Sequence, residues 1–240
     1  MTLLLLAGTG EARQIAENLT NTGADFTPWL PGEGRLARGW SRNAVRGPMA
    51  EWLANPSITS VLDASHPFST QITRHASDHC ARHNLPYCLL RRPEWQAQPG
   101  DFWTRVANDA DAARHIPAGA IVFVATGREG LIHFAACDAA YIYCRQIDAP
   151  DTPFPFPNGE YLIQKPPFAV EEEMDLFQRL DIEWLVLRNS GSTRAATKLT
   201  AARRLGLNVV MIDRPDPPDA PHVTTVAQAL EWARRQEHRK

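Results

Sequence analysis

An apolar run that ends in two glycines constrains the fold of this chain more than any other feature. Residues 3–6 are four leucines, a run of strand length, and the turn Gly8-Thr9-Gly10 follows directly. Apolar residues then recur at helical spacing over residues 12–19. The sequence therefore predicts a buried strand, a tight turn and an amphipathic helix, which is the opening unit of an α/β protein.

Glycine lets the backbone of such a turn approach a ligand closely, and the N–H groups at the start of the next helix favour an anion. The pattern differs from the usual dinucleotide motif, because Arg13 stands at the third glycine and the strand-like run 26–30 ends without an acidic residue. Arg35 and Arg38 follow instead, and cations at this place suit a 2′-phosphate. We therefore expect NADPH, with NADH as the other possibility. The alternative is a plain strand-to-helix turn of another α/β protein.

Composition narrows the class of protein. The chain has 240 residues, of which 44% are hydrophobic, so it can form one large core or two modest ones. Its formal charge of −2 argues against a nucleic-acid partner. The four cysteines have no C-x-x-C spacing, and no apolar run approaches the roughly 20 residues of a membrane span. We expect a cytoplasmic protein with reduced thiols and no membrane partner.

Strand and helix patterns alternate along the chain, which is typical of parallel sheets covered by helices on both faces. Residues 91–100, with two prolines, interrupt this pattern. The sequence predicts two Rossmann-like lobes with a cleft between them. Their expected bounds are residues 1–98, which contain the glycine-rich turn, and residues 99–240.

Four strand-to-helix junctions carry small, hydroxyl or basic residues, at 7–13, 63–68, 125–128 and 188–193. Ligands of open parallel sheets lie beyond the carboxyl ends of the strands, so these junctions are the expected binding sites. For the run 189–193, an ordinary helix cap is the alternative. The candidate cofactor-binding residues are Gly8, Thr9, Gly10, Glu11, Ala12, Arg13, Ser65, Thr126, Gly127, Arg128, Asn189, Ser190 and Gly191.

A row of histidines at 75, 79 and 83 shares one face of an expected helix. Residues eight positions apart lie about 12 Å apart along a helix, too far to bind one ion. We therefore expect a solvated helix face and no metal site.

Five blocks, in the same order along nearly the whole chain, resemble precorrin-6A reductases and cobalt-precorrin-6A reductases of cobalamin biosynthesis. The blocks are Gly8-Thr9-Gly10-Glu11-Ala12-Arg13, Asp63-Ala64-Ser65-His66-Pro67-Phe68, Thr126-Gly127-Arg128, Asn189-Ser190-Gly191 with Thr197-Lys198-Leu199, and Val210-Met211-Ile212-Asp213-Arg214-Pro215. The resemblance implies two Rossmann-like lobes and an NADPH-dependent reduction of one double bond of precorrin-6A to give precorrin-6B. Some relatives in the anaerobic route use NADH.

Such a reduction adds a hydride at one carbon and a proton at its neighbour, so a positioned acid would help. His66 is the first candidate for a catalytic proton donor and Lys198 is the second. Alternatively, His66 forms only a structural hydrogen bond within its own loop, and Lys198 is a phosphate contact or a surface residue.

The implied partner is a small polycarboxylate corrin intermediate, and neighbouring pathway enzymes are further candidates. Arginine and lysine suit carboxylates, which makes Arg91, Arg145 and Lys165 the candidate substrate contacts. Two other function classes stay open at this point. One is a two-lobed enzyme of tetrapyrrole synthesis without redox chemistry, and the other is a nucleotide-sensing module without turnover.

Overall fold

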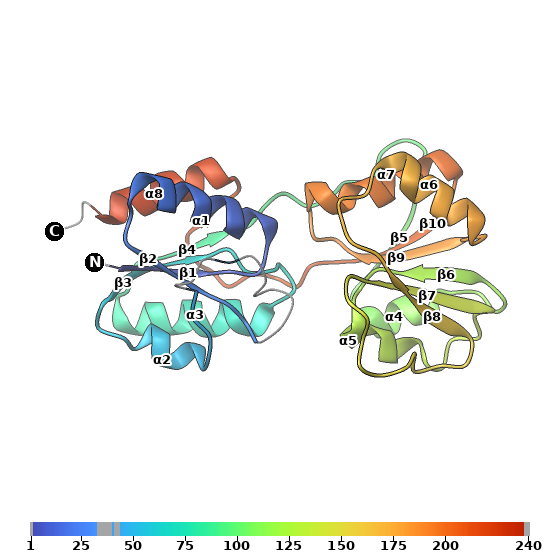
Figure 1. Cartoon of the computed structure of the whole chain (residues 1–240), viewed down its shortest axis with the longest axis horizontal. Coiled ribbons are helices and arrows are strands. Elements are labelled where there is room, and N and C mark those ends of the chain that lie inside the picture. The colour runs from blue at the N-terminus through green and yellow to red at the C-terminus, as the bar shows by residue number, and fades with distance from the viewer. Residues whose placement is uncertain (1, 33–39, 41–43, 238–240) are drawn as a thin grey trace. The chain divides into compact units, whose positions relative to one another are not determined.

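The computed structural model describes residues 2–32, 40 and 44–237 of the chain. Its contacts divide the chain into two compact units. Unit 1 comprises Met1–Pro93 and Pro215–Lys240, and unit 2 comprises Glu94–Arg214. Each unit contains a parallel sheet with helices on both faces, as the sequence predicted (Figure 1).

The sheet of unit 1 has the strand order β11-β4-β3-β1-β2, and all of its strand pairs are parallel. β1 and β3 lie side by side, and the chain leaves β1 towards β2 but leaves β3 towards β4. The strand order therefore reverses between β1 and β3, which makes this point the topological switch point of the sheet. The strands are β1 (Thr2–Leu6), β2 (Phe26–Trp29), β3 (Ile58–Asp63), β4 (Tyr87–Leu90) and β11 (His222–Val223).

Helices cover both faces of this sheet, with α1 and α8 on one face and α2 and α3 on the other (Figure 1). α1 begins after Thr9, whose side chain accepts a hydrogen bond from Ala12 N–H, and it ends at Gly23 in the left-handed conformation. The apolar stripe of α1 packs on the sheet together with Ala229 and Ala233 of α8. The helices are α1 (Gly10–Thr22), α2 (Met49–Leu53), α3 (Thr70–His83) and α8 (Val226–Glu237).

The sheet of unit 2 has the order β5-β10-β9-β6-β7-β8 and is also parallel throughout. Its strand order reverses between β6 and β9, which are neighbours. The strands are β5 (Phe102–Val106), β6 (Ile121–Val124), β7 (Tyr141–Gln146), β8 (Gly159–Ile163), β9 (Trp184–Arg188) and β10 (Asn208–Ile212).

In unit 2, α6 and α7 lie on one face of the sheet and α4 and α5 on the other (Figure 1). Phe123, Phe177 and Leu185 are fully buried between the sheet and the α6/α7 layer. The helices are α4 (Asp109–Arg114), α5 (Arg128–Leu131), α6 (Val170–Arg179) and α7 (Ala196–Leu205), with 3₁₀ turns η2 (Ile132–Phe134) and η3 (Thr193–Ala195).

The C-terminal segment corrects the expected domain bounds. The sequence predicted that residues 99–240 form one lobe, but Pro215–Lys240 belong to unit 1. β11 pairs with β4 at the edge of the first sheet, and α8 packs against α1. The reason is burial: α8 adds Ala229 and Ala233 to the same apolar cluster as the stripe of α1.

None of the helices in the described part of the chain is both long and apolar enough to cross a bilayer.

Candidate functional site

The glycine-rich turn of unit 1 lies at the switch point of its sheet. Thr9 Oγ1 donates a hydrogen bond of 2.8 Å to the carbonyl of Ala64, which ties the loop after β1 to the loop after β3. The same oxygen accepts from Ala12 N–H at 3.1 Å. Gly8 faces the second loop, since a Cβ there would lie 3.6 Å from the amide nitrogen of His66. The two junctions that the sequence predicted as binding sites in this unit are thus neighbours.

Glu11 and Arg92 form a short ion pair beside this turn. A carboxylate in the first turn of α1 would repel an anionic ligand, and the guanidinium neutralises it. Arg13, another candidate, lies with its guanidinium 5.4 Å from the centre of the Trp40 ring. Ala12 is fully buried and its N–H donates to Thr9 Oγ1, so it packs and caps the start of α1. Its cofactor contact stays a prediction.

A buried carboxylate shapes the loop that carries Ser65. Asp63 is fully buried at the end of β3, where it accepts hydrogen bonds from Ser65 N–H and from Tyr87 Oη–H, each of 2.9 Å. Burial, and next the charge of Asp63, raise the pKa of Tyr87 far above its ordinary value, so the phenol remains a donor. Ser65 Oγ lies 3.3 Å from Thr73 Oγ1 of α3. Asp63 and Tyr87 were not among the expected functional residues, and they act here by fixing the loop.

His66 follows in the same loop and is half-buried. Its Nδ1 accepts a hydrogen bond of 3.3 Å from Phe68 N–H, an arrangement that assigns the proton of the neutral ring to Nε2. A proton donor would instead be the imidazolium, whose Nδ1 carries a proton, so His66 would have to give up this hydrogen bond to act as the acid. The catalytic role of His66 stays a prediction.

Arg91 follows β4 and is half-buried, and its N–H donates to the carbonyl of Val223 at 2.8 Å. Arg35 and Arg38, on which the preference for NADPH rested, lie outside the described residues.

The corresponding turn in unit 2 follows β6. Gly127 has a φ of 84° and precedes α5, a helix of only four residues, without a side-chain cap. Arg128 is exposed. Thr126 is buried, and among the described residues its Oγ1 has no hydrogen-bond partner.

Arg188 and Asp109 form an ion pair in unit 2. Arg188, at the end of β9, donates to Asp109 Oδ2 at 2.9 Å, while the second oxygen of Asp109 has no partner in the described part of the chain. Asp109 Oδ1 and Thr126 Oγ1 both lie close to the backbone of Gly130 in α5. A Cβ added to Gly130 would be 2.4 Å from the first oxygen and 2.5 Å from the second.

Asn189 has a structural role that the sequence did not suggest. Its side-chain amide is fully buried, accepts from the N–H of Trp95 at 2.9 Å and donates to the carbonyl of Trp95 at 3.0 Å. Its own carbonyl accepts from Arg214 Nε at 2.7 Å. This amide therefore joins the end of β9 to residue 95, and a contact of Asn189 with the cofactor stays a prediction. Next to it, Ser190 Oγ accepts from Ser192 N–H at 3.4 Å, and Gly191 has a φ of 65°.

A buried charge cluster lies on the α6/α7 face of the same sheet. Arg145 of β7 donates two hydrogen bonds of 2.8 Å to the two carboxylate oxygens of Glu173, and Lys198 Nζ lies 3.4 Å from Glu173 Oε1. The exposed fractions of these side chains are 8% for Arg145, 0% for Glu173 and 13% for Lys198. Phe168 packs against the guanidinium at 4.1 Å. We call Arg145, Glu173 and Lys198 the charge cluster.

This cluster changes the interpretation of two candidates. Both Nη atoms of Arg145 bond Glu173, while its buried Nε has no partner in the described part of the chain. Its role as a substrate contact stays a prediction. Burial lowers the pKa of Lys198, Glu173 opposes that shift, and Arg145 adds to it. A lysine with a lowered pKa is a better acid near neutral pH. Lys165, the third expected substrate contact, is exposed in the loop before α6.

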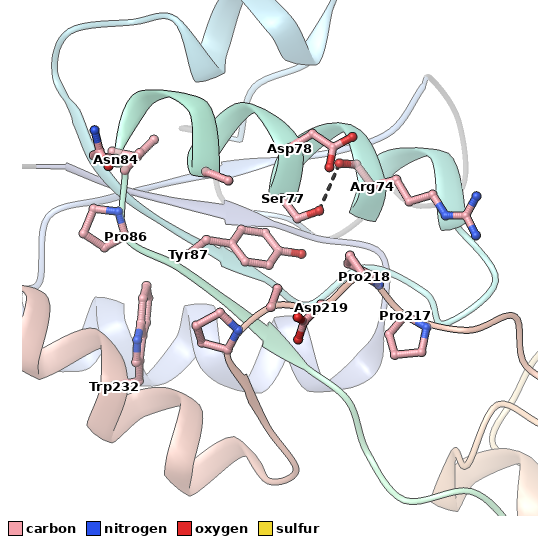
Figure 2. Close-up of a pocket in the computed structure, with 14 residues that line it drawn as sticks. Arg74, Ser77, Asp78, Asn84, Pro86, Tyr87, Pro217, Pro218, Asp219 and Trp232 are labelled. Carbon is pink, nitrogen blue, oxygen red and sulfur yellow. Dashed lines mark hydrogen bonds between the residues drawn. The ribbon is translucent and has the colours of Figure 1, made fainter.

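A groove of about 810 Å³ lies elsewhere, at the β4 edge of unit 1 (Figure 2). Its lining comes from α3, from the start of β4, from Trp232 and from the segment of Pro217, Pro218 and Asp219. No residue of either glycine-containing turn lines it, so it is separate from both switch points.

The histidine row on α3 forms no ligand set. The rings of His79 and His83 lie with their centres 4.4 Å apart, and within residues 2–32, 40 and 44–237 no three histidine, cysteine or acidic side chains could bind a metal ion together.

Comparison with known proteins gives matches to one enzyme family over nearly the whole chain. The family described as precorrin-6x reductase CbiJ/CobK matches residues 2–234. The chain is 40% identical to the precorrin-6A reductase of Rhodococcus erythropolis, with 96% of each chain covered, and 34% identical to that of Rhodobacter capsulatus, with 96% and 94% covered. It is similar in structure to a solved CobK precorrin-6A reductase, with a TM-score of 0.91, 32% identity and 98% of each chain covered.

Proposed function

The chain belongs to the precorrin-6x reductase CbiJ/CobK family, and from this premise we propose that it binds NADPH at the glycine-rich turn of unit 1. It is an oxidoreductase of cobalamin biosynthesis that reduces precorrin-6A. The observation that carries the cofactor proposal is the contact between two junctions, the turn Gly8-Thr9-Gly10 and the loop after β3, at the switch point of a parallel sheet.

The residues of unit 1 fit a dinucleotide pyrophosphate. Gly8 has no side chain to fill the space beside the His66 loop, and α1 leaves the N–H groups of its first turn without intrahelical acceptors. The 13-residue length of α1 supports a helix dipole, and Arg92 cancels the charge of Glu11. In unit 2, by contrast, α5 has four residues. Unit 1 is therefore the better candidate for the pyrophosphate.

The nicotinamide supplies a hydride when bound, and the protein orients it, excludes water and provides a proton. His66 and Lys198 are the proposed donors: His66 lies in the loop that faces Gly8, and burial lowers the pKa of Lys198. Positive residues such as Arg91 and Lys165 suit the carboxylates of the macrocycle. The four free thiols fit a cytoplasmic enzyme.

The choice of NADPH over NADH is a sequence-based prediction that mutation can test. We expect the double substitution of Arg35 and Arg38 to alanine to weaken NADPH binding roughly 10- to 100-fold, because each guanidinium would bond the 2′-phosphate. NADH lacks that phosphate, so its affinity should change little. Calorimetric titration with both cofactors measures the difference. An equal loss for both would show that these arginines do not contact the 2′-phosphate.

The function itself is tested by titrating the purified chain with NADPH and NADH, followed by an assay of nicotinamide oxidation with precorrin-6A. We expect binding and oxidation that depends on the macrocycle. Binding of NADPH without turnover would favour a nucleotide-sensing module. Binding of the macrocycle without NADPH would favour a tetrapyrrole enzyme without redox chemistry.

A further inference from the structure

The charge cluster of unit 2 has two basic side chains and one acidic side chain, an excess of positive charge within the described part of the chain. Arg145 and Lys198 are cations, and Glu173 is their common carboxylate. Among the described residues, no other acidic side chain is paired with Arg145 or Lys198. Each of the three side chains is at least 87% buried, so water screens this excess charge weakly.

Geometry shows which member of the cluster can take a ligand. Arg145 directs both Nη atoms to Glu173, and its guanidinium carbon lies 4.1 and 5.0 Å from the ring centres of Phe168 and Phe123. Only its Nε, which is buried, has no partner within the described residues. Lys198 makes one ion pair at the longer distance of 3.4 Å. An ammonium group has three N–H donors, so Lys198 retains donors for a further oxygen.

The position of the cluster supports the same conclusion. Glu173 and Lys198 lie in the first turns of α6 and α7, and Arg145 is the penultimate residue of β7. All three are therefore at the carboxyl edge of a parallel sheet, where ligands of such folds bind. The positive ends of the two helix dipoles add to the attraction for an anion.

We propose that Lys198, supported by Glu173 and Arg145, binds one oxyanion at the carboxyl edge of the unit 2 sheet. The oxyanion is a carboxylate or a phosphate group, chemistry that the macrocycle and the cofactor share. This inference rests on the proposed function for the source of the oxyanion, but the binding of an anion by the cluster does not depend on it. Glu173 and Arg145 are positioning residues, since they act through Lys198.

Anion binding should be coupled to a proton. Burial and Arg145 disfavour the charged form of Lys198 in the free protein, whereas a bound oxyanion favours it. Binding therefore raises the pKa of Lys198, and affinity falls as the pH rises through that pKa. Arginine at this position keeps its charge, so Lys198→Arg should keep binding and lose this pH dependence, whereas Lys198→Met should lose binding.

The experiment compares wild type, Lys198→Met and Lys198→Arg, with Arg204→Met as the matched control. Arg204 is a cation of the same helix, but it is half-exposed and pairs with the exposed Glu171. The measurements are the Kd for NADPH, the KM for precorrin-6A and, independently of turnover, calorimetric titration with inorganic pyrophosphate and with tricarballylate at several pH values.

We expect Lys198→Met to weaken one of these interactions roughly 10- to 100-fold, with no change for Arg204→Met. A raised Kd for NADPH assigns the oxyanion to the cofactor, and a raised KM for precorrin-6A alone assigns it to the macrocycle. Anion titrations that are identical in wild type and a folded Lys198→Met variant would overturn the proposal. If wild type binds pyrophosphate or tricarballylate through Lys198 but not NADPH, the cofactor proposal fails and this one stands.

Discussion

Replacing Gly8 with valine should weaken NADPH binding by about 100-fold or more while the chain stays folded. Gly8 is not among the glycines with positive φ, and a Cβ there meets its nearest atoms at 3.6 and 3.8 Å, which is ordinary contact. A branched side chain would instead occupy the space where the pyrophosphate approaches the backbone. Two charge-assisted hydrogen bonds lost at about 1.5 kcal/mol each give a loss of this size.

Gly8→Ala is the size control for this prediction. A methyl group fits the available distances, so this variant should fold as wild type and lose less affinity. Calorimetric titration gives the Kd values, and a thermal unfolding curve shows that each variant is folded. A folded Gly8→Val protein with wild-type affinity would exclude the turn from the cofactor site.

Replacing Arg145 with methionine should lower the free energy of unfolding by about 3–5 kcal/mol, because it leaves the buried carboxylate of Glu173 with only the more distant Lys198. The double variant Arg145→Met with Glu173→Leu removes both members of the pair. It should recover only part of the loss, since the buried carboxylate that Arg145 would leave behind is removed as well, but Lys198 then has no counter-ion in the cluster.

Urea unfolding of wild type, both single variants and the double variant measures the coupling between the two residues. Arg145→Lys should be intermediate, because an ammonium cannot make the two parallel hydrogen bonds of the guanidinium. A loss below about 0.5 kcal/mol for Arg145→Met, the range of ordinary surface substitutions, would contradict the buried pair.

Local sequence patterns predicted the parts of the fold that depend on neighbouring residues. The leucine run at residues 3–6, the helical stripe that follows it and the glycine at position 23 predict β1, α1 and its end, and the structure confirms all three. The four junctions were also correctly placed after strands, because a change from strand to helix pattern marks them. The two junctions of each unit lie at the switch point of its sheet. Which junctions become neighbours depends on the strand order, and local sequence patterns do not give that order.

The return of the C-terminal segment to unit 1 depends on long-range packing and was therefore missed. β11 has only two residues, too few for an alternating pattern, and its pairing with β4 joins residues more than 130 positions apart in the chain. The helical pattern of α8 was predicted, but a helix pattern does not say which sheet the helix covers.

The roles of the site residues depend on the same kind of distant partner. Asn189 follows a strand, as a binding residue would, but its amide meets Trp95, 94 positions away. Glu173 was missed because an acidic residue in the first turn of a helix is explained by the helix dipole alone. The only sequence signal was its place in an apolar stripe, four residues before Phe177, since a buried acid there requires a cation.

A crystal structure of the whole chain grown with excess NADPH would show where the pyrophosphate binds. We expect the pyrophosphate to lie over the backbone N–H groups of residues 8–11, next to the loop of Ser65 and His66. Cofactor bound only at the turn of Thr126, Gly127 and Arg128, or absent from the turn at residues 8–11, would contradict this expectation.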